Sequence, residues 1–392
     1  MLFTKEVLKP NINLFLSVFM NLELLKFRIG ITLINGIGNN LAKNLIAYLG
    51  NEEAIFKEKK KNLAKIPGIG ANLAKEIINH KDALLRAEEE IEFILNNNIQ
   101  HFYYTDKDYP FRLKECPDAP LLLFAKCAQS LNDAKFVGVV GTRNATPYGK
   151  EICRDFIAQL AQLPNIVVVS GLAYGIDICA HKAALDYNIP TIGVIAHGLD
   201  KIYPPGHRSI AVKMLEKGGL VTEYLSKTNP DRQNFVQRNR IIAGLADALV
   251  VVESAKKGGA LITADLANDY NRDVFAFPGR INDEWSIGCN ALIRNNKASL
   301  IDSTEDFIKI MGWENQSHTK QSVQTEIFIE LTADEQLIYT SIRKFPDGIH
   351  VNELAVTLGF SYSKLTALLL QMEFKSLVKC LPGGMYKVIN IG

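Results

Sequence analysis

The sequence lacks the patterns that mark several common classes of protein. Its six cysteines include no C-x-x-C pair, which argues against a zinc ribbon or a disulfide framework and favours the reduced thiols of a cytoplasmic protein. The apolar stretch at residues 12–25 is too short to span a bilayer and is interrupted by Asn13, Asn21 and Glu23, so we expect no membrane insertion. Lys and Arg number 44 against 42 Asp and Glu, so any polyanionic partner must be held by a local basic patch.

The composition that remains is typical of a globular chain with several domains. Its 392 residues suggest two to four domains, and 47% hydrophobic with 22% charged residues exclude a disordered or collagen-like protein. Regular amphipathic structure begins near Met20, and no targeting pattern precedes it. Met20 is therefore an alternative to Met1 as the start of translation.

An internal repeat is the first informative feature. Residues 36–46 return as residues 68–78, with eight of eleven positions identical and a period of thirty-two. Each copy reads as a helix, a Gly-Ile-Gly turn and a second helix, which resembles a helix-hairpin-helix unit. Two interpretations stay open: the glycines let helix amides approach a phosphate, or they only allow tight packing.

The middle of the chain predicts an α/β fold. Short β-branched runs alternate with amphipathic helical stretches, as in a Rossmann-like, doubly wound parallel sheet. The strands are predicted at residues 136–140, 166–169, 191–195, 220–222, 248–252 and 274–276. Ligands bind such sheets at the carboxyl ends of the strands, so candidate site residues are expected in the loops that follow them.

Four segments organise the chain. We expect a helical domain with the helix-hairpin-helix repeat (SAM-like) at residues 20–130, the Rossmann-like core at 131–312, a polar linker at 313–332 and a winged-helix domain at 333–392. The winged helix is predicted from helices at 333–342, 351–358 and 361–377, followed by a hairpin at 378–388. Its third helix is mostly apolar, so docking to a protein and reading a DNA groove are both open.

The loop after the first predicted strand has the composition of an anion site. Backbone amides, hydroxyls and one guanidinium are available there at the start of a helix, and they come from Gly141, Thr142, Arg143 and Thr146. Nucleotide fingerprints are absent: the loop has no G-x-G-x-x-G, and Glu151 stands where a P-loop needs Ser or Thr.

The second strand leads into Ser170, Gly171 and a helix that carries Asp177 and, four residues later, His181. A metal site or acid–base pair is one interpretation of Asp177 and His181. The favoured interpretation is an Asp that caps the helix or orients the histidine. Ser170 lacks the G-x-S-x-G context of a nucleophile and is expected to be a turn hydroxyl.

The loop after the third strand combines aromatic and basic side chains. Tyr203 and His207 offer flat faces on which bases can stack, and Lys201 and Arg208 add positive charge. A rigid proline loop with a solvated basic edge is the alternative interpretation.

Arg238 and Arg240 flank an Asn at the head of an apolar helix, just after Phe235. They are either structural partners of Glu223 and Glu253 or a phosphate clamp, and both interpretations stay open.

A last glycine-rich loop, at residues 256–259, precedes another helix. Several anion-binding loops thus meet at one sheet edge, which suits a polymer backbone better than one small phosphate.

Together these blocks resemble the DNA-processing protein A family, also called DprA or Smf. The matching segments are Val140-Gly141-Thr142-Arg143, Ser170-Gly171-Leu172-Ala173-Tyr174-Gly175-Ile176-Asp177, Gly198-Leu199-Asp200, Tyr203-Pro204, Phe235 with Arg238-Asn239-Arg240, and Phe277-Pro278-Gly279. The resemblance implies a core that binds single-stranded DNA, forms a homodimer, protects incoming DNA and loads the recombinase RecA during natural transformation. It also suggests single-strand binding protein as a partner.

The residues expected to contact DNA are Gly141, Thr142, Arg143, Thr146, Ser170, Gly171, Lys201, Tyr203, His207, Arg208, Phe235, Arg238, Asn239, Arg240, Lys257, Gly258 and Gly259. No catalytic residue, metal or cofactor is expected. The rival function is a nucleotide or phosphoribosyl hydrolase with a related core, but its helix needs a catalytic Glu and only Asp265 is present. A transcriptional regulator is a third reading, disfavoured by the weakly basic third helix of the winged-helix domain.

Overall fold

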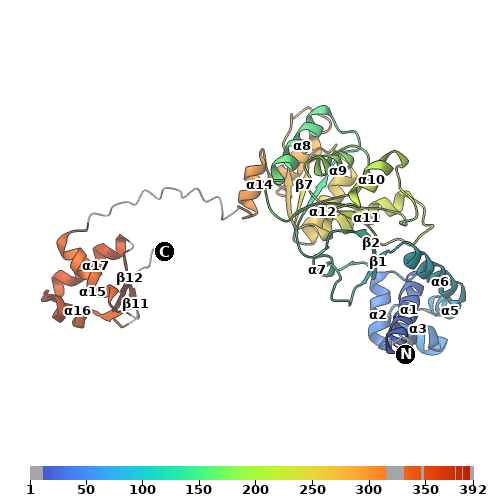
Figure 1. The fold of residues 1–392 in the computed structure, drawn as a ribbon, viewed down its shortest axis with the longest axis horizontal. Helices are drawn as coiled ribbons and strands as arrows, with labels where there is room; N and C mark the ends of the chain where they lie inside the picture. Colours follow the sequence, from blue (N-terminus) through green and yellow to red (C-terminus); the bar gives the residue numbers. More distant parts are fainter. Residues whose placement is uncertain (1–11, 315–330, 346–347, 376, 382, 389–392) are drawn as a thin grey trace, which may run out of the picture. The chain divides into compact units, whose positions relative to one another are not determined.

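The computed structural model describes residues 12–314, 331–345, 348–375, 377–381 and 383–388, which fall into two units, residues 1–314 and 315–392 (Figure 1). The linker predicted at residues 313–332 lies almost wholly outside the described residues. In the described part of the chain, no helix is long and apolar enough to cross a membrane.

The amino-terminal helices gather at one end of the first unit, next to the first two strands (Figure 1). They are α1 (Ile12–Thr32), α2 (Asn39–Leu49), α3 (Glu52–Lys57), α4 (Lys60–Leu63), α5 (Ala71–Ile78) and α6 (Lys81–Asn96). Regular structure thus begins at Ile12, ahead of Met20.

The two copies of the repeat pack reciprocally. Gly36 and Gly68 have φ of +83° and +84°, a backbone conformation that side chains with a Cβ rarely adopt. A Cβ on Gly36 would lie 3.2 Å from Cδ1 of Leu73, and a Cβ on Gly68 would lie 3.2 Å from Cδ1 of Leu41. Because these glycines and these leucines occupy equivalent positions of the repeat, each copy packs its leucine onto the glycine turn of the other.

A nine-stranded sheet forms the rest of this unit, in the order β1-β2-β6-β5-β4-β3-β7-β8-β9. The strands are β1 (Gln100–Tyr103), β2 (Leu122–Cys127), β3 (Lys135–Val140), β4 (Ile166–Ser170), β5 (Thr191–Val194), β6 (Gly219–Thr222), β7 (Ala248–Val251), β8 (Asp273–Ala276) and β9 (Ser299–Leu300). Strands β3 to β9 pair in parallel, and the winding direction reverses at β3. The predicted doubly wound α/β core is confirmed, and the six predicted strands end within one residue of their observed bounds.

The sheet begins earlier in the chain than the core expected from residue 131. Strand β2 pairs antiparallel with β6, and β1 pairs antiparallel with β2. Leu123 and Ala125 of β2 join the same buried cluster as Val221 of β6, so hydrophobic contact holds this hairpin on the edge of the parallel strands.

Helices cover both faces of the sheet. The remaining helices of the unit are α7 (Phe111–Lys114), α8 (Pro147–Leu160), α9 (Ile176–Asp186), the 3₁₀ turn η1 (Pro205–His207), α10 (Arg208–Met214), α11 (Arg232–Leu245), α12 (Gly259–Asp269), α13 (Ile287–Arg294) and α14 (Thr304–Ile310). Residues of α11, α12 and α13 bury one face with Phe136 and Val169, and residues of α8, α9 and α14 bury the other with Val137 and Val168. Successive residues of a strand thus point to opposite faces of the pleated sheet, and both faces are buried.

The second unit is a winged helix, as predicted. It consists of α15 (Ala333–Arg343), β10 (Ile349–His350), α16 (Val351–Leu358), α17 (Tyr362–Phe374), β11 (Val378–Leu381) and β12 (Met385–Val388). Its sheet has the order β10-β12-β11. Pro382, in the turn of the predicted hairpin, lies outside the described residues.

Candidate nucleic-acid interface

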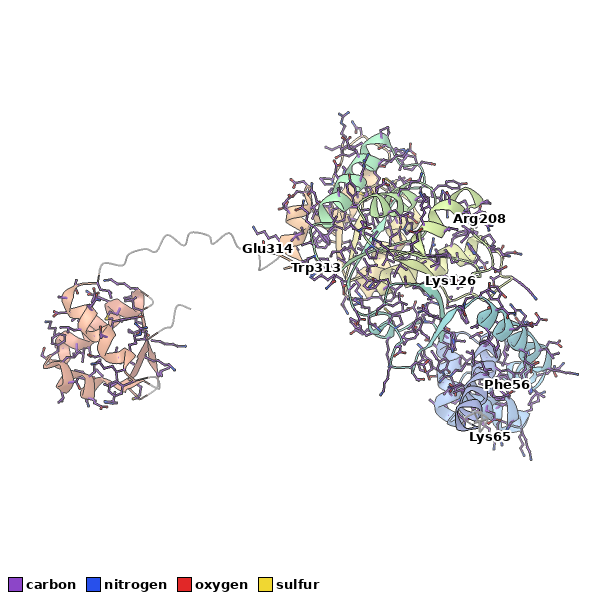
Figure 2. All side chains as sticks on the ribbon, viewed as in Figure 1. Phe56, Lys65, Lys126, Arg208, Trp313 and Glu314 are labelled. Carbon is purple, nitrogen blue, oxygen red and sulfur yellow. The ribbon has the colours of Figure 1, made fainter. Side chains whose placement is uncertain are left out.

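The loops at the carboxyl ends of the parallel strands hold the expected site residues. Because β5, β4, β3 and β7 are neighbours in the sheet, the loops that follow them lie along one edge. Twelve of the expected residues are exposed or partly exposed: Gly141, Thr142, Arg143, Thr146, Lys201, Tyr203, Arg208, Phe235, Arg240, Lys257, Gly258 and Gly259. Arg208 stands at the start of α10 on the surface (Figure 2).

Arg143, Phe235 and Tyr203 form an aromatic–basic cluster in the middle of this edge. The guanidinium carbon of Arg143 lies 5.4 Å from the centroid of the Phe235 ring. The Phe235 and Tyr203 rings have centroids 5.8 Å apart, and Tyr203 is 43% exposed. Within the described ranges Arg143 has no hydrogen bond or ion pair, so its charge is available to a ligand.

Two further tyrosines extend the aromatic surface and were missed as site residues. Tyr174, after β4, is 53% exposed and packs edge-on against His207, with ring centroids 4.8 Å apart. Tyr148, in the first turn of α8 after β3, is 51% exposed. In the sequence, each of these tyrosines directly precedes a glycine shortly after a predicted strand, where a side chain is not expected to pack in the core. This pattern could have identified both as surface residues.

The amino terminus of α12 is open. Its N-cap residue, Gly258, has an extended backbone and no side chain that could cap the helix. Lys256, Lys257, Gly258 and Gly259 are all exposed. Uncapped amides at the positive end of a helix, with two lysines beside them, are suited to an anion.

The side chain of Lys201, in the loop after β5, contacts two polar residues. Its ammonium lies 3.6 Å from a carboxylate oxygen of Asp200 and donates to Asn229 Oδ1 at 3.3 Å. Thr142 keeps its hydroxyl partly exposed while accepting a hydrogen bond from the backbone of Asn144 at 3.1 Å.

The other five expected residues are buried. They are Ser170, Gly171, His207, Arg238 and Asn239. Ser170 is the last residue of β4 and does not lie in a turn. Its hydroxyl donates across the sheet to the carbonyl of Val139 in β3 at 2.6 Å. Nδ1 of His207 is 2.9 Å from the carbonyl oxygen of Leu172, so this ring supports Tyr174 more than it faces solvent.

Arg238 and Arg240 act as structural residues. Arg238 is buried and donates to the carbonyl oxygens of Gly171, at 2.6 Å, and Val194. Burial lowers the pKa of Arg238 to about 10, while the nearby Asp177 carboxylate opposes this shift. Its guanidinium thus fastens the ends of β4 and β5 under α11, and no bond to Glu253 is formed.

Arg240 forms an ion pair with Glu223 and donates to the carbonyl of Asp118 at 2.7 Å. The pairing of Arg240 with Glu223 fits the structural interpretation. The phosphate-clamp interpretation is disfavoured for both arginines, because each guanidinium group already donates to acceptors within the protein.

Asp177 does cap the loop before α9, but the expectation that it orients His181 is wrong. Its Oδ2 accepts from the amides of Gly171 at 3.1 Å and Ala173 at 3.4 Å. Nδ1 of His181 instead lies 2.8 Å from Thr191 Oγ1. In the part of the chain that the structure describes, no three His, Cys, Asp or Glu side chains form a group that could hold a metal.

Glu253 occupies the crevice between β3 and β7, where the winding reverses. Its Oε2 accepts from the amide of Thr146 at 2.9 Å, and its Oε1 accepts from the Thr146 hydroxyl. A Cβ on Gly149 would lie 2.1 Å from the same carboxylate. A protein carboxylate therefore stands at the amino terminus of α8, the position at which open α/β sheets bind the phosphates of nucleotides.

The first copy of the repeat docks onto the loop before β2. Asn39 Oδ1 accepts from the amide of Leu121 at 3.2 Å, and the Lys43 ammonium donates to the carbonyl of Ala119 at 3.0 Å. Their equivalents in the second copy, Ala71 and Lys75, are exposed. For the first copy the packing interpretation therefore fits.

In the winged helix, α17 presents little free charge. Lys364 pairs with Asp334 at 2.7 Å and Lys375 pairs with Glu335 at 2.6 Å. Phe374, by contrast, is 82% exposed. These contacts favour docking to a protein over reading a DNA groove.

Three family models match the chain: DNA recombination-mediator protein A over residues 100–312, a SAM-like helix-hairpin-helix tandem over residues 29–80, and the DprA winged helix domain over residues 329–384.

Protein Smf of Synechocystis sp. is 36% identical over 283 residues, covering 71% of this chain and 70% of that protein. The DNA processing protein DprA of Bacillus subtilis is 39% identical over 217 residues, covering 55% and 72%. The X-ray structure of DprA from Streptococcus pneumoniae matches with a TM-score of 0.62 and 32% identity, covering 75% of this chain and 98% of that one. The chain therefore belongs to the DNA-processing protein A (DprA/Smf) family.

Proposed function

We propose that this protein is a cytoplasmic, non-enzymatic recombination mediator that binds single-stranded DNA, protects it and loads RecA onto it during natural transformation. The observation that carries the proposal is the exposed cluster of Arg143, Phe235 and Tyr203 at the carboxyl edge of the sheet. Bases stack on aromatic rings without regard to sequence, and a guanidinium without an internal partner pairs with phosphate.

The exposed tyrosines suggest the path of the DNA. Tyr148, Tyr174 and Tyr203 follow β3, β4 and β5, which are consecutive neighbours in the sheet. The Tyr148 hydroxyl donates to the carbonyl of Pro278, which follows β8, at 3.5 Å, so the three side chains are spread along this edge and are not spaced by one strand each. This supports a DNA strand that crosses the sheet edge, with the open amino terminus of α12 receiving a phosphate.

The arrangement disfavours the nucleotide hydrolase. Glu253 fills the phosphate position at the amino terminus of α8 with a negative charge. Asp265 of α12 is half-exposed and paired with Lys297 at 2.7 Å, so it is not directed at a buried substrate.

A mediator must also contact the recombinase, because a protein that only coats DNA would compete with RecA for the same phosphates. The name of the matching family model, DNA recombination-mediator protein A, supports this part of the proposal. A homodimer and a contact with single-strand binding protein belong to the proposal on the same family grounds.

Gel shifts with single-stranded DNA, duplex DNA and a mononucleotide test the binding function. We expect preference for the single strand, and hydrolysis of the mononucleotide would instead support the rival enzyme. Mediation is tested by the ATP turnover of RecA on strands covered by single-strand binding protein. We expect a shorter lag when this protein is added, and an unchanged lag under conditions of proven DNA binding would leave a binder without mediator activity.

A further inference from the structure

Two cysteines meet between α8 and α9. Cys153 of α8 is fully buried, and Cys179 of α9 is partly buried. The Cys179 thiol donates to the carbonyl of Lys150, one turn before Cys153, with 3.5 Å between sulfur and oxygen. Both side chains pack in the hydrophobic cluster that fills this helix contact, and each thiol shifts the pKa of the other, so the two sulfur atoms are neighbours.

The surroundings of Cys179 favour its thiolate. The hydrogen bond with Cys153 lowers the pKa of Cys179 to about 7, and the positive charges of Lys150, Lys182 and Arg154 act in the same direction. The same contact and burial raise the pKa of Cys153. Burial also raises the pKa of three other thiols, those of Cys116, Cys127 and Cys289. A partly exposed cysteine in a basic environment, with a second thiol beside it, is the arrangement of redox-sensitive cysteines.

We propose that Cys179 and Cys153 are a redox-active pair, in which a hydroperoxide oxidises Cys179 and Cys153 then closes an intramolecular disulfide. In the first step the Cys179 sulfur attacks one oxygen of hydrogen peroxide. The S–O bond forms, the O–O bond breaks, and the leaving hydroxide takes up a proton to become water. Cys179 is then a sulfenic acid.

In the second step the Cys153 sulfur attacks the sulfur of Cys179. The S–S bond forms, the S–O bond breaks, and the Cys153 proton leaves with the hydroxyl group as a second water. Two thiols thus lose two electrons and two protons to one peroxide molecule, and a dithiol reductant reverses the reaction by exchange.

The disulfide links two helices that lead away from the proposed DNA-binding edge. α8 follows the loop with Arg143, and α9 follows the loop with Tyr174. Any effect of the disulfide on DNA binding rests on the proposed function, whereas formation of the disulfide does not. The two can therefore be tested separately: a protein that does not bind DNA could still form the disulfide.

The test uses the reduced full chain, treated with hydrogen peroxide, blocked with a thiol alkylating reagent, digested and mapped by mass spectrometry. We expect a peptide pair that joins Cys153 to Cys179 and disappears on treatment with dithiothreitol. We also expect iodoacetamide to label Cys179 severalfold faster at pH 7 than the exposed Cys380. Oxidation that spares Cys179, or a disulfide formed by another pair, would overturn the proposal.

Variants identify the roles of the two thiols. Cys179→Ser should abolish the disulfide, and Cys380→Ser, the matched control at an exposed position, should leave it unchanged. Cys153→Ser should let the sulfenic acid accumulate on Cys179, where dimedone traps it. Because Cys153 is buried and its variant can fail to fold, the peptide map of the unmodified sequence stays the deciding measurement.

Discussion

Glu253 accepts hydrogen bonds from both the amide and the hydroxyl of Thr146, so a side chain from the end of β7 caps the helix that follows β3. Thr146 in turn accepts from the amide of Gly149 at 3.1 Å. The crevice at the reversal point of the sheet is therefore closed by the protein's own carboxylate, and the proposed DNA-binding surface lies on the exposed aromatic side chains outside it.

Glu253→Ala should destabilise the protein by about 3 kcal/mol, because it leaves the buried donors of Thr146 without an acceptor. Urea denaturation measures the loss, with Glu284→Ala, at an exposed position, as the control.

Inorganic phosphate should raise the melting temperature of Glu253→Ala more than that of the unsubstituted protein, since the amino terminus of α8 then lacks its anion. Equal shifts would show that Glu253 does not occupy an anion site.

Arg143→Ala should weaken binding of single strands of every sequence and reduce the slope of log K against log salt by about one unit. The reason is the expected loss of one phosphate contact from a guanidinium that has no hydrogen bond or ion pair within the described residues. Arg294→Ala is the matched control, because this exposed residue ends α13, which runs back toward the opposite edge of the sheet. Binding isotherms at several salt concentrations measure the effect, and an unchanged isotherm would exclude Arg143 from the interface.

Tyr203→Ala should lower the affinity for single-stranded DNA by about 5- to 150-fold, which corresponds to about 1–3 kcal/mol for one stacked base. Tyr203→Phe keeps the ring and should bind as the unsubstituted protein does. Equal losses in the two variants would point to a hydrogen bond of the hydroxyl instead of stacking. The same pair of substitutions at Tyr174 tests the extended path across the sheet edge.

Acid should destabilise the core through His181. This side chain is fully buried, and burial, followed by the charges of His207 and Arg238, lowers its pKa to about 3. The unfolded chain binds the proton near the ordinary value of about 6.5, so the contribution of neutral His181 is complete above that pH and is lost as the pH falls toward 3. Between pH 7 and pH 4 this amounts to about 3 kcal/mol. Chemical denaturation at a series of pH values should give a shallower dependence for His181→Gln, and identical slopes would contradict this assignment.

Removal of the second unit should leave the first unit folded and able to bind DNA, because the two units have separate hydrophobic cores. A chain that starts at residue 130 should instead aggregate, since loss of β2 exposes the edge of β6. Size-exclusion chromatography and circular dichroism of residues 1–314 and 130–314 compare the two. A monodisperse, folded 130–314 fragment would show that the hairpin of β1 and β2 is dispensable.

Most of the parallel strands were predictable because they are short, mainly apolar runs with β-branched residues, which is the pattern of a strand buried on both faces. The hairpin of β1 and β2 was not. Residues 121–125 were apolar, but their pairing with β6 is antiparallel and joins segments nearly one hundred residues apart, which no local pattern encodes.

The site was predictable as a set of loops and less so residue by residue. Arg143 and Tyr203 follow from their positions in the loops after β3 and β5, whereas Phe235 stands in the first turn of α11. Arg238 looked like a ligand because of its charge, yet it shares the i, i+3, i+4, i+7 stripe of Ile241, Ile242 and Leu245, which are all buried. The helical period therefore placed this arginine in the interior, and only the three-dimensional structure supplied the carbonyl oxygens that satisfy it.

The reciprocal contacts of Leu41 with Gly68 and of Leu73 with Gly36 have a consequence for the amino-terminal helices. Equivalent surfaces that face each other in this way are related as the subunits of a twofold dimer, here joined in one polypeptide. Because both halves are parts of one chain, they are always present in equal number. Their sequences can nevertheless differ from each other. Asn39 and Lys43 attach the first half to the loop before β2. The second half has Ala71 in place of Asn39 and the same lysine at Lys75, and it turns this surface to solvent.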